Sequence, residues 1–92
     1  MNWHVAYYIN SKTLPRQAHV AVLIALSWAD PVEDGVVLVR DYQEKQAKYA
    51  RYDGDLIVGL RLAVAAGWLG PIEELPDGSI RTSLCVPEGV AP

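Results

Sequence analysis

Two long apolar segments, residues 15–29 and 55–69, constrain this chain more than any other feature. Both have the length and the flanking turn residues of helices, and the apolar residues of the second cannot all fit on one helical face. A helix that is apolar nearly all round is normally buried. Because a single domain of 92 residues has little room to bury two such helices fully, part of their surface should remain as an exposed patch.

This leftover apolar surface predicts an interface, either between two copies of the chain or with a partner protein. We assign four residues to it: Trp3, Ile57, Val58 and Leu62. The alternative is that the N-terminal segment, which is rich in aromatic residues, covers the exposed face within one chain.

Clusters of Pro, Gly and Asp divide the chain into segments. The pattern predicts a short helix over 2–9, a helix over 15–29, a strand over 36–39, helices over 41–52 and 55–69, and a hairpin with strands at 72–75 and 79–86. Residues 2–9 also alternate as a strand would, and we favour the helix. We expect one domain over 1–92, with a core spanning about 14–86 and a loose tail over 87–92.

The order of these segments is typical of a winged helix-turn-helix. The third and fourth helices are joined by a tight turn, and a two-stranded hairpin follows at once, in the position of the wing. The expected fold is therefore α+β and mainly helical, with a short strand near 36–39 and a C-terminal β-hairpin wing.

Two stretches resemble small phage and plasmid winged-helix proteins of the replication-initiator-like or regulatory type. The first resembles their first helix and contains Leu14-Pro15, the apolar run 20–26, Ala29-Asp30 and Gly35. The second is similar to the end of their recognition helix and contains Leu56, Leu60, Ala63 and the step Ala66-Gly67-Trp68-Leu69. The resemblance implies a winged helix whose recognition helix is 55–69, and DNA as its partner.

The charge pattern shows where DNA would be held. The net charge is −3, but residues 40–51 carry +2 and residues 52–92 carry −4. The candidate phosphate contacts are Arg40, Lys45, Lys48, Arg51, Arg61 and Arg81. The alternative for the stripe formed by Lys45, Lys48 and Arg51 is an ordinary solvated helix face.

No pattern of a catalytic or metal site is found in the sequence. The two histidines and the single cysteine, Cys85, lack zinc-ligand spacing, and there is no glycine-rich phosphate loop or nucleophile motif. We expect no enzymatic activity and no cofactor. One cysteine suits the reducing cytoplasm, where we place the protein, and the longest apolar run, 20–26, is too short for a membrane span.

These observations lead to two hypotheses. The first is a dimeric DNA-binding regulatory protein of the phage type. The second is a winged helix that binds a host or partner protein through an apolar helix face. The first is the leading hypothesis, because the family resemblance favours it. The second is the alternative. It is supported by Ile57, Val58 and Leu62, which occupy outward positions that are basic in DNA-reading helices, and by the wing, which is acidic apart from Arg81.

Overall fold

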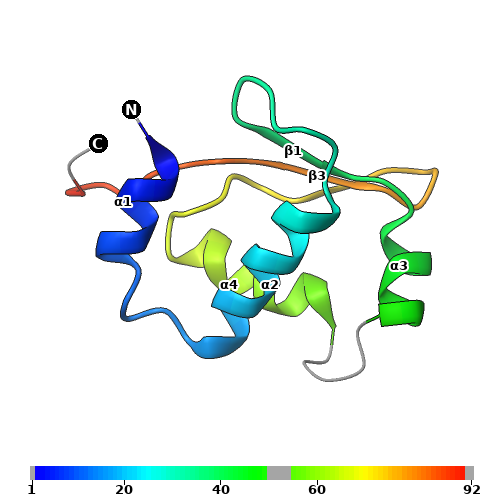
Figure 1. Cartoon of the computed structure of the whole chain (residues 1–92), viewed down its shortest axis with the longest axis horizontal. Helices are drawn as coiled ribbons and strands as arrows, with labels where there is room; N and C mark the ends of the chain where they lie inside the picture. Colours follow the sequence, from blue (N-terminus) through cyan, green and yellow to red (C-terminus); the bar gives the residue numbers. More distant parts are fainter. Residues whose placement is uncertain (1, 50–54, 91–92) are drawn as a thin grey trace.

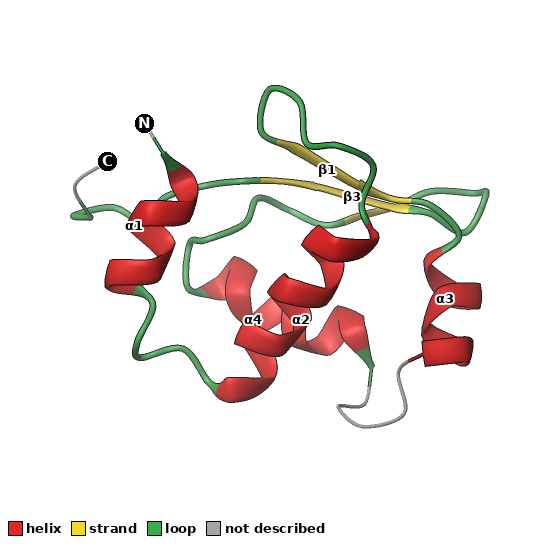
Figure 2. Cartoon of the chain, in the orientation of Figure 1, coloured by secondary structure: helices red, strands yellow, loops and turns green. Residues whose placement is uncertain are grey.

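The computed structural model describes residues 2–49 and 55–90 and shows an α+β fold (Figure 1). Its described elements are α1 (Trp3–Asn10), α2 (Arg16–Trp28), β1 (Val36–Val39), α3 (Tyr42–Tyr49), α4 (Leu56–Ala65), β2 (Glu73–Glu74) and β3 (Ile80–Ser83). The strands form one antiparallel sheet in the order β1-β3-β2, and the described helices lie on one side of it (Figure 2). The predicted α+β class, the N-terminal helix and the strand over 36–39 are confirmed.

Two predicted helices end differently from the expectation. The helix predicted over 55–69 ends at Ala65, because Gly67 takes a positive φ of 90° and the Trp68 N–H turns back to the Ala63 carbonyl at 3.0 Å. Such a glycine cap ends a helix and points the next residue inward, and Trp68 is buried. Of the helix predicted over 41–52, the structure describes 42–49, and the remainder lies outside the described residues.

The centre of the fold is the contact between α2 and α4. Ala18, Ala21 and Ala25 of α2 are buried here, together with Leu60 and Gly59 of α4. A Cβ added to Gly59 would lie 2.5 Å from the Ala21 Cβ and 2.7 Å from the Gln17 carbonyl oxygen. The two apolar helices are therefore partly buried against each other, and their small residues allow the backbones to approach closely.

The N-terminal helix closes one end of the core. The Trp3 indole N–H donates to the carbonyls of Trp68 at 3.2 Å and Cys85 at 2.8 Å, and the Trp3 ring stacks on Tyr7. Trp3 is only 6% exposed. The assignment of Trp3 to an association interface is therefore wrong: the residue belongs to the core, because its indole fills the space beside Trp68.

The core is longer than the predicted span of about 14–86. It begins at Trp3, and at the other end Val90 packs against it, so residues 87–90 are not the loose tail that we expected. One side of the sheet contributes Val37, Val39 and Ile80 to the same core.

The hairpin and the sheet edge are closed by backbone hydrogen bonds. In the turn between β2 and β3 the Leu75 N–H donates to the Ser79 carbonyl at 2.8 Å. At the outer edge of β1, the Val36 N–H donates to the Glu33 carbonyl and the Asp30 N–H donates to the Leu38 carbonyl. The loop before β1 thus covers a strand edge that could otherwise pair with another chain.

Candidate interaction surfaces

The exposed side of α4 is apolar apart from Arg61. Val58 is 47% exposed and Leu62 is 37% exposed, while Leu56 and Leu60 on the opposite side are buried against the core. The exposed side forms one stripe because its members are spaced three or four residues apart on the helix. We call this stripe the α4 face; it consists of Ile57, Val58, Arg61, Leu62 and Ala65. The structure therefore brings together three of the four predicted interface residues and separates Trp3 from them.

A polar network fixes the N-terminal end of α4 to α3. The Asp55 carboxylate accepts hydrogen bonds from the Ile57 N–H at 3.0 Å and from the Tyr42 hydroxyl at 2.7 Å. The Gln46 side-chain oxygen accepts from the Leu56 N–H. Asp55 is thus the N-cap of α4, and the α3 side chains hold the start of the helix in place.

This network shifts the pKa of both ionisable members. The hydroxyl of Tyr42, and then the Ile57 N–H, hold the pKa of Asp55 below its ordinary value. Burial, followed by the hydrogen bond to Asp55, raises the pKa of Tyr42 to about 12. At neutral pH the pair is therefore a phenol that donates to a carboxylate, which is a charge-assisted hydrogen bond.

The three predicted arginine contacts in the described residues are each paired with a carboxylate. Arg40 Nε lies 2.7 Å from Asp30 and Arg81 lies 2.7 Å from Glu73, while Arg61 lies 3.8 Å from Glu74. All three pairs are exposed, so each contributes little to stability. The carboxylates matter more for DNA recognition: they disfavour phosphate binding, because a phosphate that approaches any of these arginines also meets a carboxylate.

The predicted lysine stripe is not a free surface. Lys45 is half-buried, and its Nζ donates to the Trp28 carbonyl at 3.3 Å, at the C-terminal end of α2. A cation at this position satisfies a carbonyl that the helix leaves unpaired. Lys48 also has an interaction partner. Arg51, the third member, lies outside the described residues.

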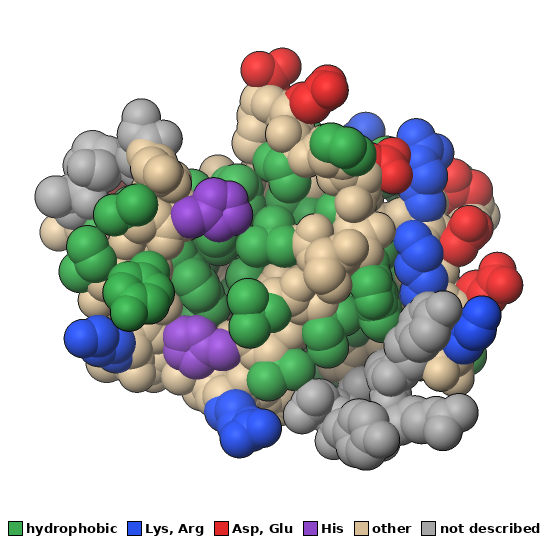
Figure 3. Space-filling view, viewed as in Figure 1, with side chains coloured by type: hydrophobic (Ala, Val, Ile, Leu, Met, Phe, Trp, Pro, Cys, Tyr) green, Lys and Arg blue, Asp and Glu red, His purple; other side chains and the backbone are tan. Residues whose placement is uncertain are grey.

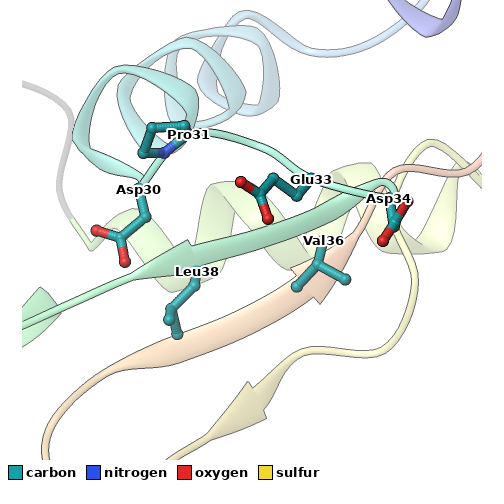
Figure 4. Close-up of a pocket in the computed structure, with 6 residues that line it drawn as sticks. All are labelled: Asp30, Pro31, Glu33, Asp34, Val36 and Leu38. Atoms are coloured by element: carbon teal, nitrogen blue, oxygen red, sulfur yellow. The ribbon is translucent and has the colours of Figure 1, made fainter.

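A hollow of about 490 Å³ on the outer side of β1 carries acidic side chains (Figure 4). Asp30, Glu33 and Asp34 line it with Val36 and Leu38. Figure 4 shows the three carboxylates spread along the loop rather than pointing to one spot, and Asp30 is paired with Arg40. Among the described residues, no group of His, Cys, Asp or Glu has the arrangement that would hold a metal ion.

A second apolar surface was not predicted. Tyr8 is 82% exposed and Leu23 is 65% exposed, and Val5 and Ile9 are more than half exposed. Figure 3 shows apolar side chains gathered over α1 and α2. The spacing of Val5, Tyr8 and Ile9 on the helix opposite Trp3 is the sequence signal that could have found this surface.

Comparison with protein-family models, curated proteins and solved structures yields no match for this chain. Among the described helices, none combines the length and the apolar character needed to cross a bilayer.

Proposed function

We propose that this protein is a winged helix that binds a partner protein through the α4 face. The proposed fold is supported by the element order α2-β1-α3-α4-β2-β3 and by the sheet order β1-β3-β2. In this arrangement α3 and α4 form the helix-turn-helix, β2 and β3 form the wing, and β1 pairs with the second wing strand. α1 is an addition at the N-terminal end.

The observation that carries the proposed function is the chemistry of the α4 face. In a winged helix this face would be the recognition surface, and here it presents Val58 and Leu62 with one cation, Arg61. Apolar side chains around an arginine are typical of the centre of a protein–protein interface. A DNA phosphate would gain little from such a surface.

A capture experiment with the immobilised 92-residue chain tests the proposal. Val58→Lys is expected to abolish capture of the partner, because a charge would be buried in the interface. Val36→Lys is the matched control: Val36 is 41% exposed, it lies on the edge strand β1, and lysine is well tolerated there. Proteins that are retained by wild type and Val36→Lys but lost with Val58→Lys support the proposal. Equal capture by all three proteins would contradict it.

DNA binding is the second candidate, favoured by the same element order and by the exposed position of Arg61 on the proposed recognition helix. Fluorescence anisotropy with pooled duplexes at low salt tests it. If DNA is the partner, Val58→Lys should strengthen binding, since it adds a cation to the α4 face. The same variant therefore moves the two candidate activities in opposite directions. No binding at tens of micromolar protein would discard the DNA role.

A further inference from the structure

The exposed apolar surface over α1 and α2 plays no part in the function proposed for the α4 face. We call it the α1–α2 face; its exposed apolar residues are Val5, Tyr8, Ile9 and Leu23. The Tyr7 hydroxyl and His19 Nδ1 are hydrogen-bonded at 2.7 Å, which fixes the two helices side by side. Leu23 lies one turn beyond His19 on α2. Exposed apolar residues gathered in this way mark an association site.

The charges around this face are separated by sign. Arg16 is the first residue of α2 and Lys12 lies in the connection before it. Glu33 and Asp34 lie in the loop that follows the end of α2, and all four residues are exposed. Figure 3 shows basic side chains at the connection between α1 and α2, acidic side chains on the loop before β1, and apolar side chains between them. The two charged ends are separated by the length of α2, about 20 Å.

This layout is complementary to itself. Turning a second copy by 180° about an axis across the middle of α2 places its acidic loop against the basic end of the first copy, and the reverse contact forms at the same time. Leu23 lies near the middle of α2, so each Leu23 would meet the partner's Leu23. A parallel pairing would instead bring like charges together, which is unfavourable.

The size of the face is sufficient for such a contact. Figure 3 views the molecule down its shortest axis, so this is one of the two broad faces, with extents of 36 and 27 Å. A stable protein interface buries about 800 Å² on each partner. The α4 face is not involved, because α4 lies behind α2 in the same view.

We propose that two copies of the chain associate face to face through the α1–α2 face, in an antiparallel two-fold dimer held by Tyr8 and Leu23 and by Arg16 paired with the partner's Glu33. This goes beyond the proposed function. It also replaces the dimer surface that the sequence predicted, since Val58 and Leu62 remain exposed on the other side for a partner. The dimer would present two α4 faces that point in opposite directions.

Light scattering and sedimentation equilibrium on the full chain, from micromolar to several hundred micromolar, test the dimer. Wild type is expected at twice 10.1 kDa at the upper concentrations. Leu23→Asp is expected to remain a monomer, and Leu62→Asp, the matched change on the α4 face, to dimerise as wild type does. A monomeric wild type, or a dimer that Leu62→Asp disrupts and Leu23→Asp does not, overturns the proposal. A monomer that co-sediments with phosphatidylserine vesicles would assign the face to an anionic membrane and also overturns it.

A charge exchange tests the antiparallel arrangement. Arg16→Glu is expected to weaken the dimer by about tenfold, because it places a carboxylate against the partner's Glu33. Adding Glu33→Lys to the same chain is expected to restore the affinity. Failure of the double variant to recover overturns the antiparallel pairing. Since no variant in this set alters the α4 face except the Leu62→Asp control, failure of the dimer leaves the capture experiment unaffected.

Discussion

The two contacts that hold α4 are built in opposite ways. Against α2, the helix is held by shape alone, through Gly59, Ala21 and the fully buried Leu60. Against α3, it is held by hydrogen bonds: the Tyr42 hydroxyl donates to Asp55, and the Gln46 side-chain oxygen accepts from the Leu56 N–H. The first contact contains no ionisable side chain, whereas the second depends on the ionisation of one carboxylate. The position of the α4 face is thus set by packing at its middle and by electrostatics at its start.

The largest effect is expected from removing a buried side chain from the contact between α4 and α2. Leu60→Ala removes a side chain with no exposed surface, which leaves a cavity between α4 and its neighbours. We expect a loss of about 2–5 kcal/mol in the free energy of unfolding. Urea denaturation followed by circular dichroism measures it. Leu62→Ala on the exposed side of the same helix serves as control, and equal losses for both would contradict the packing described here.

The second-largest effect is expected from adding side-chain volume to the contact between α2 and α4. Gly59→Val places a new Cβ 2.5 Å from the Ala21 Cβ. Because this distance is too short, α2 and α4 must move apart. The expected cost is about 1–3 kcal/mol. Ala65→Val, at an exposed position of α4, introduces the same residue without the clash and should cost much less. The second substitution Ala21→Gly in the Gly59→Val background should recover part of the loss if the clash is the cause.

The polar contact should respond to pH as well as to mutation. Tyr42→Phe removes the hydroxyl that donates to Asp55, and we expect it to cost about 1 kcal/mol at pH 7. Because the pKa of Asp55 is lowered in the folded state, its contribution is present above the ordinary carboxyl pKa of about 3.9 and is lost as the pH falls through the lowered value. The difference in the free energy of unfolding between wild type and Tyr42→Phe, measured by urea titration, should therefore be smaller near pH 2 than at pH 7. A constant difference would show that the carboxylate is not the partner that matters.

The smallest effect is expected at the exposed ion pairs. Arg81→Gln breaks the contact with Glu73, where both side chains are about half exposed. The thermal midpoint should change little, and any change should vanish in 1 M NaCl because salt screens such pairs. A large, salt-independent shift would mean that Arg81 supports the sheet in another way.

Local patterns predicted the elements well, because their signals lie within a few residues. The strand over 36–39 and the glycine-bounded turn after Leu75 both depend on neighbouring residues. Contacts between distant residues were not predictable in this way. Nothing in the local sequence pairs Arg40 with Asp30 or directs Lys45 to the Trp28 carbonyl, so the basic stripe was interpreted without its partners.

The same distinction explains where the structure places the residues that we assigned to an interface. Val58 and Leu62 are exposed, and Ile57 is half-buried, because Gly59 and Leu60 determine which side of α4 meets α2. Trp3 was misplaced because its partners, Trp68 and Cys85, are more than sixty residues away. The alternative that the N-terminal segment covers the exposed apolar face is also wrong in part: Trp3 and Tyr7 pack inward, but Tyr8 is the most exposed large apolar residue described.

The bond between the Trp3 indole and the Cys85 carbonyl has a consequence for the order of folding. It joins positions 82 residues apart, nearly the full length of the chain. Contacts of such long range close late, because the loop between them must first lose its freedom. α1 can therefore take its final place only after the C-terminal segment has been synthesised and β3 has formed. Since α1 carries three of the four exposed apolar residues of the α1–α2 face, this face is complete in a ribosome-bound chain only after residue 85 has been synthesised.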